Sequence, residues 1–181
     1  MNIFTSHYDF LKESASILLK RAQNAAAPDR SDALARFRAV EPYASRTDEL
    51  QLKDSLAVVA AENGYATWTE LKGALDRAAE SSPLAEIKDQ FYPKGFTTYW
   101  NIWFAKYAQA KKVLQDGGGY LLPYRNQYFI VEEHFVDSIG IPHTLPEWET
   151  IGRDWVHPKQ VKAWLRLNDV AAAALKERQG Q

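Results

Sequence analysis

The chain has 181 residues, of which 46% are hydrophobic and 13% aromatic, and this composition suits a globular protein of one domain or a small pair. With 22 basic and 23 acidic residues the formal net charge is -1, so the overall charge favours neither nucleic acid nor an anionic membrane as a partner. The absence of cysteine excludes disulfides, thiolate nucleophiles and cysteine-ligated zinc.

The N-terminal part carries four patterns of apolar residues at helical spacing. They predict helices over about residues 6–27, 32–40, 52–64 and 67–78. Thr67 and Glu70 form a capping box in sequence, in which each side chain satisfies a backbone N–H at the start of the last of these helices. Gly64 ends the helix before it, as glycine commonly does.

Two segments in this part carry a family resemblance. Val59-Ala60-Ala61-Glu62-Asn63-Gly64-Tyr65 is followed by Trp68-Thr69-Glu70-Leu71-Lys72. Over about residues 8–78 the chain resembles the short helical module found in bacterial proteins ahead of ankyrin repeats. The resemblance implies a four-helix scaffold and a bacterial or phage-like origin, and it brings no catalytic residues. No ankyrin Thr-Pro-Leu-His motif follows.

The segment 79–83 is small and polar and contains a proline, so we expect the domain boundary there. The expected domains are a helical module over residues 1–80 and a small α+β domain over 81–181. A short helix is expected over 84–91.

Aromatic residues crowd the segment 98–115, which we interpret as a central helix. Polar or small residues recur there at intervals of three or four and form one stripe, while rings occupy most of the remaining circumference. A helix that is apolar on most sides is buried on most sides. The rings are therefore expected to form the core of the second domain, or alternatively to line a groove for a ligand or partner.

A glycine stop and a β-hairpin are expected next. Gly117, Gly118 and Gly119 follow the helical pattern, so they fit a helix end and not a phosphate loop, whose glycines precede a helix. Residues 120–124 and 127–131 are rich in aromatic and β-branched residues and predict two strands joined by a tight turn. Pro123 cannot donate a hydrogen bond to a sheet, so the first strand is expected at an edge.

The remaining elements complete an α+β, mostly α, fold. We expect a short helix over 132–139, a possible third strand within 148–156, and a C-terminal amphipathic helix that begins at Pro158. No apolar run approaches the roughly 18 residues of a membrane span, and no basic region precedes an apolar run at the N-terminus. We therefore expect a cytoplasmic protein without a membrane segment.

The sequence offers few residues for chemistry. None of the four histidines lies in a metal-binding motif, so we expect no metal, no cofactor and no catalytic residues assigned by motif. The most suggestive polar group is Asp154 beside Trp155, with His157 nearby, although on a strand the side chains of Asp154 and His157 would point to opposite faces. An ion pair between Asp154 and Arg125 with a purely structural role is an alternative of equal weight to a catalytic role for this group.

Three functions follow from these observations. The favoured hypothesis is a non-catalytic binding or protein-interaction protein with an unknown protein or small ligand as partner. Its candidate binding residues are Trp100, Trp103, Tyr107, Tyr124, Arg125, Asp154 and His157. The alternative is a small enzyme whose site combines Tyr124, Arg125, Asp154 and His157. A nucleic-acid-associated factor is third, because acidic residues interleave with the basic ones throughout. The sequence assigns no oligomeric state.

Overall fold

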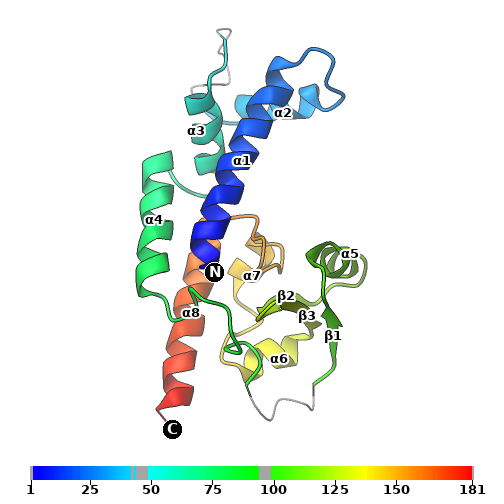
Figure 1. Cartoon of the computed structure of the whole chain (residues 1–181), viewed down its shortest axis with the longest axis vertical. Coiled ribbons are helices and arrows are strands. Elements are labelled where there is room, and N and C mark those ends of the chain that lie inside the picture. Colours follow the sequence, from blue (N-terminus) through cyan, green and yellow to red (C-terminus); the bar gives the residue numbers. More distant parts are fainter. Residues whose placement is uncertain (1, 42, 44–48, 94–98, 181) are drawn as a thin grey trace. The chain divides into compact units, whose positions relative to one another are not determined.

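The structure is a computed structural model that describes residues 2–41, 43, 49–93 and 99–180. These residues form eight helices and one three-stranded antiparallel sheet, which confirms the prediction of an α+β, mostly α, fold (Figure 1). The chain divides into two compact units. We call Phe4–Asp76 the helical unit, and Arg77–Gln181 with Met1–Ile3 the C-terminal unit. Within the described residues, no helix combines the length and the apolar character needed to cross a membrane.

Four helices supply the helical unit: α1 (Ile3–Gln23), α2 (Arg30–Arg38), α3 (Leu52–Glu62) and α4 (Trp68–Ser81), of which α1 and α4 extend slightly beyond it. The core of the unit takes apolar side chains from all four. They include Phe4, Leu11, Leu18, Phe37, Val58, Leu71 and Leu75, all 6% exposed or less. The predicted helices are thus present, with ends that differ by a few residues.

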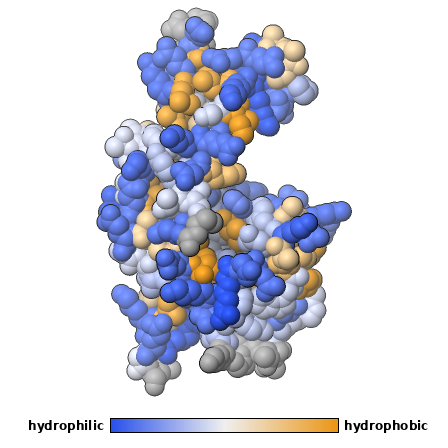
Figure 2. Space-filling view, viewed as in Figure 1, coloured by the Kyte–Doolittle hydropathy of each residue, from blue (hydrophilic) through white to orange (hydrophobic). Residues whose placement is uncertain are grey.

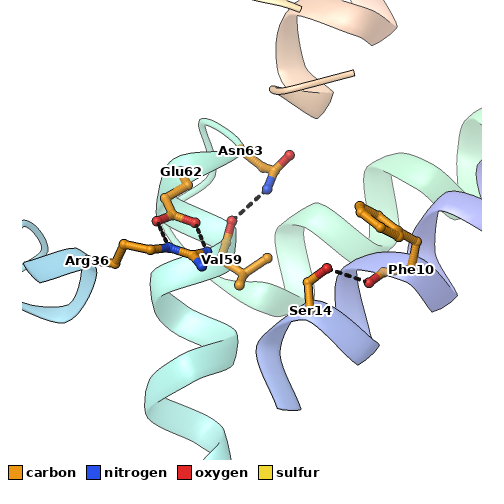
Figure 3. Close-up of polar contacts among 6 residues, drawn as sticks. All are labelled: Phe10, Ser14, Arg36, Val59, Glu62 and Asn63. Atoms are coloured by element: carbon orange, nitrogen blue, oxygen red, sulfur yellow. Dashed lines mark hydrogen bonds and ion pairs between the residues drawn. The ribbon is translucent and has the colours of Figure 1, made fainter. Parts of the chain in front are cut away.

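Hydrogen bonds at the start of α4 and a bidentate ion pair between α2 and α3 stabilise the helical unit. At the start of α4, the backbone N–H of Glu70 donates to Thr67 Oγ1 at 3.1 Å, as the predicted cap requires. The Glu70 carboxylate accepts from the N–H of Ala66 at 3.2 Å, one residue earlier than in a standard capping box. Arg36 of α2 meets Glu62 of α3 through two hydrogen bonds of 2.7 and 2.6 Å, a bidentate pair that fixes these helices side by side (Figure 3).

The sheet of the C-terminal unit consists of β1 (Asn101–Phe104), β2 (Tyr120–Tyr124) and β3 (Gln127–Val131), in the order β1-β3-β2. The hairpin β2–β3 has the bounds predicted from the sequence, and Pro123 lies on an edge strand, as expected. The central strand β3 pairs along its whole length with β2 and with β1 at Tyr128 to Val131.

Helices cover both faces of this sheet. On one face, Ala110 and Leu114 of α5 (Tyr107–Gly117) pack against Leu121 and Ile130. On the other, Phe135 of α6 (Glu133–Ser138) contacts the sheet, and Figure 1 shows α5 and α6 on opposite sides. The unit is completed by α7 (Pro146–Thr150) and α8 (Val161–Gln179).

The predicted central aromatic helix over 98–115 is wrong. Residues 101–104 form strand β1, and the helix α5 begins only at Tyr107. Residues 94–98 lie outside the described part of the chain. On β1, Asn101 and Trp103 share one face and Ile102 and Phe104 share the other. Because both faces carry apolar or aromatic side chains, the strand shows no clear alternation. The polar stripe expected over 98–115 combined residues of two separate elements, β1 and α5.

The third strand is therefore β1, and the strand proposed within 148–156 is also wrong. Residues 146–150 form the short helix α7, with Pro146 in its first turn, where proline is favoured. Only an isolated parallel bridge joins Asp154 to Leu121. Residues 84–91 form turns and bends and no helix, and the last helix starts at Val161, after Pro158.

The glycine stop after α5 behaves as predicted and gives a test. Gly119 has φ +94°, and a Cβ atom there would lie 2.8 Å from Ile130 Cγ2 and 2.8 Å from the carbonyl oxygen of Val131. Gly119→Ala should therefore lower the free energy of unfolding by at least about 2 kcal/mol. Gly117→Ala is the matched control, since a Cβ there has no neighbour within 4 Å, and its effect should lie between zero and about 1 kcal/mol of stabilisation. Equal effects of both substitutions in chemical denaturation would contradict this account.

Candidate functional site

Trp103 on β1 is an exposed ring with a well-defined setting. Its indole stacks on Phe129, with ring centroids 4.8 Å apart, and meets the rings of Tyr92 and Tyr124 at 5.2 and 5.3 Å. Its Nε1 donates to Asn101 Oδ1 at 2.6 Å. Trp103 nevertheless exposes 38% of its surface. We call Tyr92, Trp103, Tyr124 and Phe129 the aromatic cluster; it holds Trp103 in place and leaves part of the indole in solvent.

The hairpin turn beside this cluster is anchored to a neighbouring loop. The Arg125 guanidinium lies over the Tyr124 ring, 5.2 Å from its centroid. The backbone N–H of Arg125 donates to the carbonyl of Lys88 at 2.9 Å, and the guanidinium approaches Asp89 at 3.8 Å. Arg125 has φ 52°, a left-handed conformation that the two-residue turn imposes. The backbone hydrogen bond from Arg125 to Lys88 thus holds the hairpin turn beside Tyr124, whose ring contacts Trp103.

Trp100 lies immediately before β1 and, among the described residues of this unit, is the most exposed large hydrophobic residue, at 59%. Its neighbour Tyr99 is anchored, with its ring 5.6 Å from that of Phe135. Trp100 and Trp103 therefore place two solvent-exposed indoles on one short, anchored segment.

A second group of residues surrounds the buried carboxylate of Asp154, which is 0% exposed. Its Oδ2 accepts hydrogen bonds from Tyr107 Oη at 2.7 Å and from Lys111 Nζ at 2.9 Å. Its Oδ1 accepts from the backbone N–H groups of Val156 and His157, each at 3.0 Å. The rings of Tyr107 and His157 are 4.5 Å apart. We call Tyr107, Lys111, Asp154 and His157 the Asp154 cluster.

The Asp154 cluster is better suited to structure than to proton transfer. All the hydrogen bonds to Asp154 occupy the oxygens that a general base would need for a substrate. Burial, with the hydrogen bond to Asp154, raises the pKa of Tyr107 above its ordinary value, which opposes ionisation. Burial lowers the pKa of His157, against an opposing effect of Asp154, so its imidazole is neutral at pH 7.

Lys111 also borders an open pocket of about 300 Å³. Arg153, Lys159 and Glu149 line the same pocket, and Arg153 is paired with Glu149. Because Lys111 is paired with Asp154 and Arg153 with Glu149, two of the three lining cations are balanced by carboxylates. Among the described residues, no group of three or more histidine, aspartate or glutamate side chains is placed to hold a metal ion.

The candidate residues from the sequence separate into two places. Trp103, Tyr124 and Arg125 lie at the aromatic cluster, whereas Asp154 and His157 lie in the Asp154 cluster together with Tyr107. The four residues considered as one catalytic site, Tyr124, Arg125, Asp154 and His157, are thus divided between these two clusters. Trp100 is exposed and immediately precedes β1, the strand that carries Trp103.

The charged partners differ from those considered in the sequence. Asp154 pairs with Lys111, and Arg125 approaches Asp89, so the Asp154–Arg125 pair is not formed. The sequence does not predict Lys111 as a partner of Asp154. Tyr107 and Lys111 are four residues apart and share a face of α5, but this spacing does not identify the carboxylate that they contact.

No family model, no curated protein and no solved structure matches the chain. What this protein does is therefore inferred from its own residues.

The Asp154 cluster predicts a large effect of removing its charge. Asp154→Asn leaves the ammonium of Lys111 without its carboxylate; the Lys111 side chain is 25% exposed. The substitution should lower the free energy of unfolding by about 3 kcal/mol, the low end of the range of losses for a broken buried ion pair. The double variant Asp154→Asn with Lys111→Met should recover part of this loss. Asp89→Asn, at a 58% exposed side chain, is the control and should stay within about 0.5 kcal/mol. An effect of Asp154→Asn as small as that of the control would show that the pair stabilises nothing.

Proposed function

We propose that the C-terminal unit is a non-catalytic binding module that recognises a partner protein through the surface around Trp103. Trp100, Trp103, Tyr124 and Arg125 are the contact residues of this surface. The observation that carries the proposal is the exposure of two indoles, Trp100 at 59% and Trp103 at 38%, on the segment 99–104, whose other residues are partly buried.

The chemistry of the surface supports recognition of a protein. Tryptophan, tyrosine and arginine are the residues most enriched among those that dominate binding energy at protein interfaces. Trp103 is already held by Phe129, Tyr92 and Tyr124, so little side-chain entropy is lost when a partner covers it. Hydrophilic residues cover most of the face that Figure 2 shows, and its hydrophobic residues form separate groups, so a broad apolar interface is not evident on that face.

The enzyme alternative has less support. Its four proposed residues lie in two clusters, and the carboxylate of Asp154 is fully engaged by Tyr107, Lys111 and two backbone N–H groups. Proton-transfer groups need a free acceptor within reach of a substrate.

The proposal extends to the setting of the protein. The lack of cysteine supports a reducing compartment, so we assign the protein to the cytoplasm. The resemblance of residues 8–78 to a bacterial helical module supports a bacterial or phage-like origin, with the helical unit as a scaffold.

Capture of partners from a lysate of the source organism tests the proposal. Full-length wild-type protein should capture a partner that Trp103→Ala binds with about 30-fold lower affinity. This is the loss expected when an anchor residue that contributes about 2 kcal/mol is removed. Leu52→Ala is the matched control, because Leu52 is an apolar residue of the helical unit with 44% exposure. A partner retained equally by wild type, Trp103→Ala and Leu52→Ala would contradict the proposal.

A further inference from the structure

The hydrogen-bonding directions of the sheet follow from its hairpin. A two-residue turn joins Tyr124 to Gln127, so these two residues form the hydrogen-bonded pair that closes the hairpin. In an antiparallel pair, hydrogen-bonded and non-hydrogen-bonded positions alternate. On β2, the backbone groups of Tyr120, Leu122 and Tyr124 therefore face β3, and those of Leu121 and Pro123 face away from it.

Hydrogen bonds outside the sheet confirm this alternation. The N–H of Leu121 donates to the carbonyl of Arg153 at 2.9 Å, and the carbonyl of Leu121 accepts from the N–H of Trp155 at 3.0 Å. Pro123, the other outward position, has no N–H to leave unpaired. The outer edge of β2 is thus occupied at Leu121 by the segment 153–155. At Pro123 this edge offers no N–H group to another strand.

The same alternation fixes the directions on β1. The backbone N–H and C=O groups of Phe129 and Val131 on β3 point toward β2. Only those of Tyr128 and Ile130 can therefore form hydrogen bonds with β1. Their partners are Phe104 and Ile102. The N–H and C=O groups of Asn101 and Trp103 therefore point to the outer edge of β1. Within the described part of the chain, no backbone hydrogen bond to that edge is present.

We propose that an extended segment of the partner protein adds to β1 as a fourth strand. This inference rests on the proposed function, since it uses the same surface. The two N–H and two C=O groups of Asn101 and Trp103 match the groups of one extended strand, the mode known as strand addition. The segment supplies alternate apolar side chains, one set against the exposed indole of Trp103 and the other beside Ile102.

The character of the edge supports this occupant. Proteins usually protect an edge strand with proline or charge, and the sequence Asn101-Ile102-Trp103-Phe104 contains neither. Figure 1 shows β1 at the margin of the sheet, away from β2. A second copy of the chain is a poorer occupant, because pairing of two four-residue strands falls well short of the roughly 1,200–2,000 Å² that a stable dimer buries. A flexible peptide can bind with useful affinity while burying a smaller area than this.

A pair of substitutions at Asn101 separates the backbone from the side chain. Asn101→Pro removes an outward N–H at the first residue of an edge strand, where proline is tolerated, and Asn101→Ala keeps that N–H and removes only the side chain. The probes are peptides of about twelve residues, selected on full-length wild-type protein from a random display library. Strand addition predicts that Asn101→Pro weakens their binding roughly tenfold relative to Asn101→Ala.

A second readout needs no variant of the protein. Strand addition requires that only every second residue of the bound peptide directs its N–H toward β1. Methylation of the peptide backbone nitrogens, one at a time, should therefore abolish binding with a period of two. This scan decides the matter if Asn101→Pro fails to fold.

Three results would overturn strand addition. The first is equal binding by Asn101→Pro and Asn101→Ala together with a methylation scan without periodicity. The second is failure of the library to yield any peptide with the period-two pattern. The third is a wild-type dimer in sedimentation that Asn101→Pro converts to a monomer, which would assign the edge to a second copy. Binding lost in Trp103→Ala but kept in Asn101→Pro removes strand addition and leaves the binding module in place, whereas binding kept in both removes both.

Discussion

The pairing of backbone N–H and C=O groups is the constraint on which the C-terminal unit depends. A sheet of three strands has one central strand, β3, and two edges. Burial of unpaired backbone groups is costly, so each edge is either occupied, blunted or left in solvent. On β2 the edge is occupied at Leu121 by the segment 153–155. On β1 the outward groups of Asn101 and Trp103 remain available, and this asymmetry gives the unit its one open edge among the described residues.

The Asp154 cluster accounts for the asymmetry. Asp154 lies within the segment that meets β2, and its buried carboxylate binds Tyr107 and Lys111 of α5 and the N–H of His157. These bonds fix the segment to the helix that covers one face of the sheet. An isolated carboxylate would not be buried there without such partners. The cluster therefore acts as a structural tie, whereas the exposed indole of Trp103 lies on β1, at the opposite edge of the sheet.

The sequence predicted those parts of the fold in which local signals agree. The hairpin, the glycine stop and the edge position of Pro123 each follow from one residue property, and the structure confirms them. Strand β1 was not predictable, because apolar residues occupy both of its faces and its four residues are too few to show a period. Asp154 and His157 were recognised as a polar group, but Lys111 lies 43 residues from Asp154, and only the folded chain brings them together.

Amide hydrogen exchange of the free protein, followed residue by residue by NMR, tests the central claim most directly. If the outer edge of β1 is open, the amides of Asn101 and Trp103 exchange rapidly, while those of Ile102 and Phe104, which bond to β3, are protected. Protection of the Trp103 amide equal to that of Ile102 would show that the edge is already occupied, and it would contradict the account given for this protein.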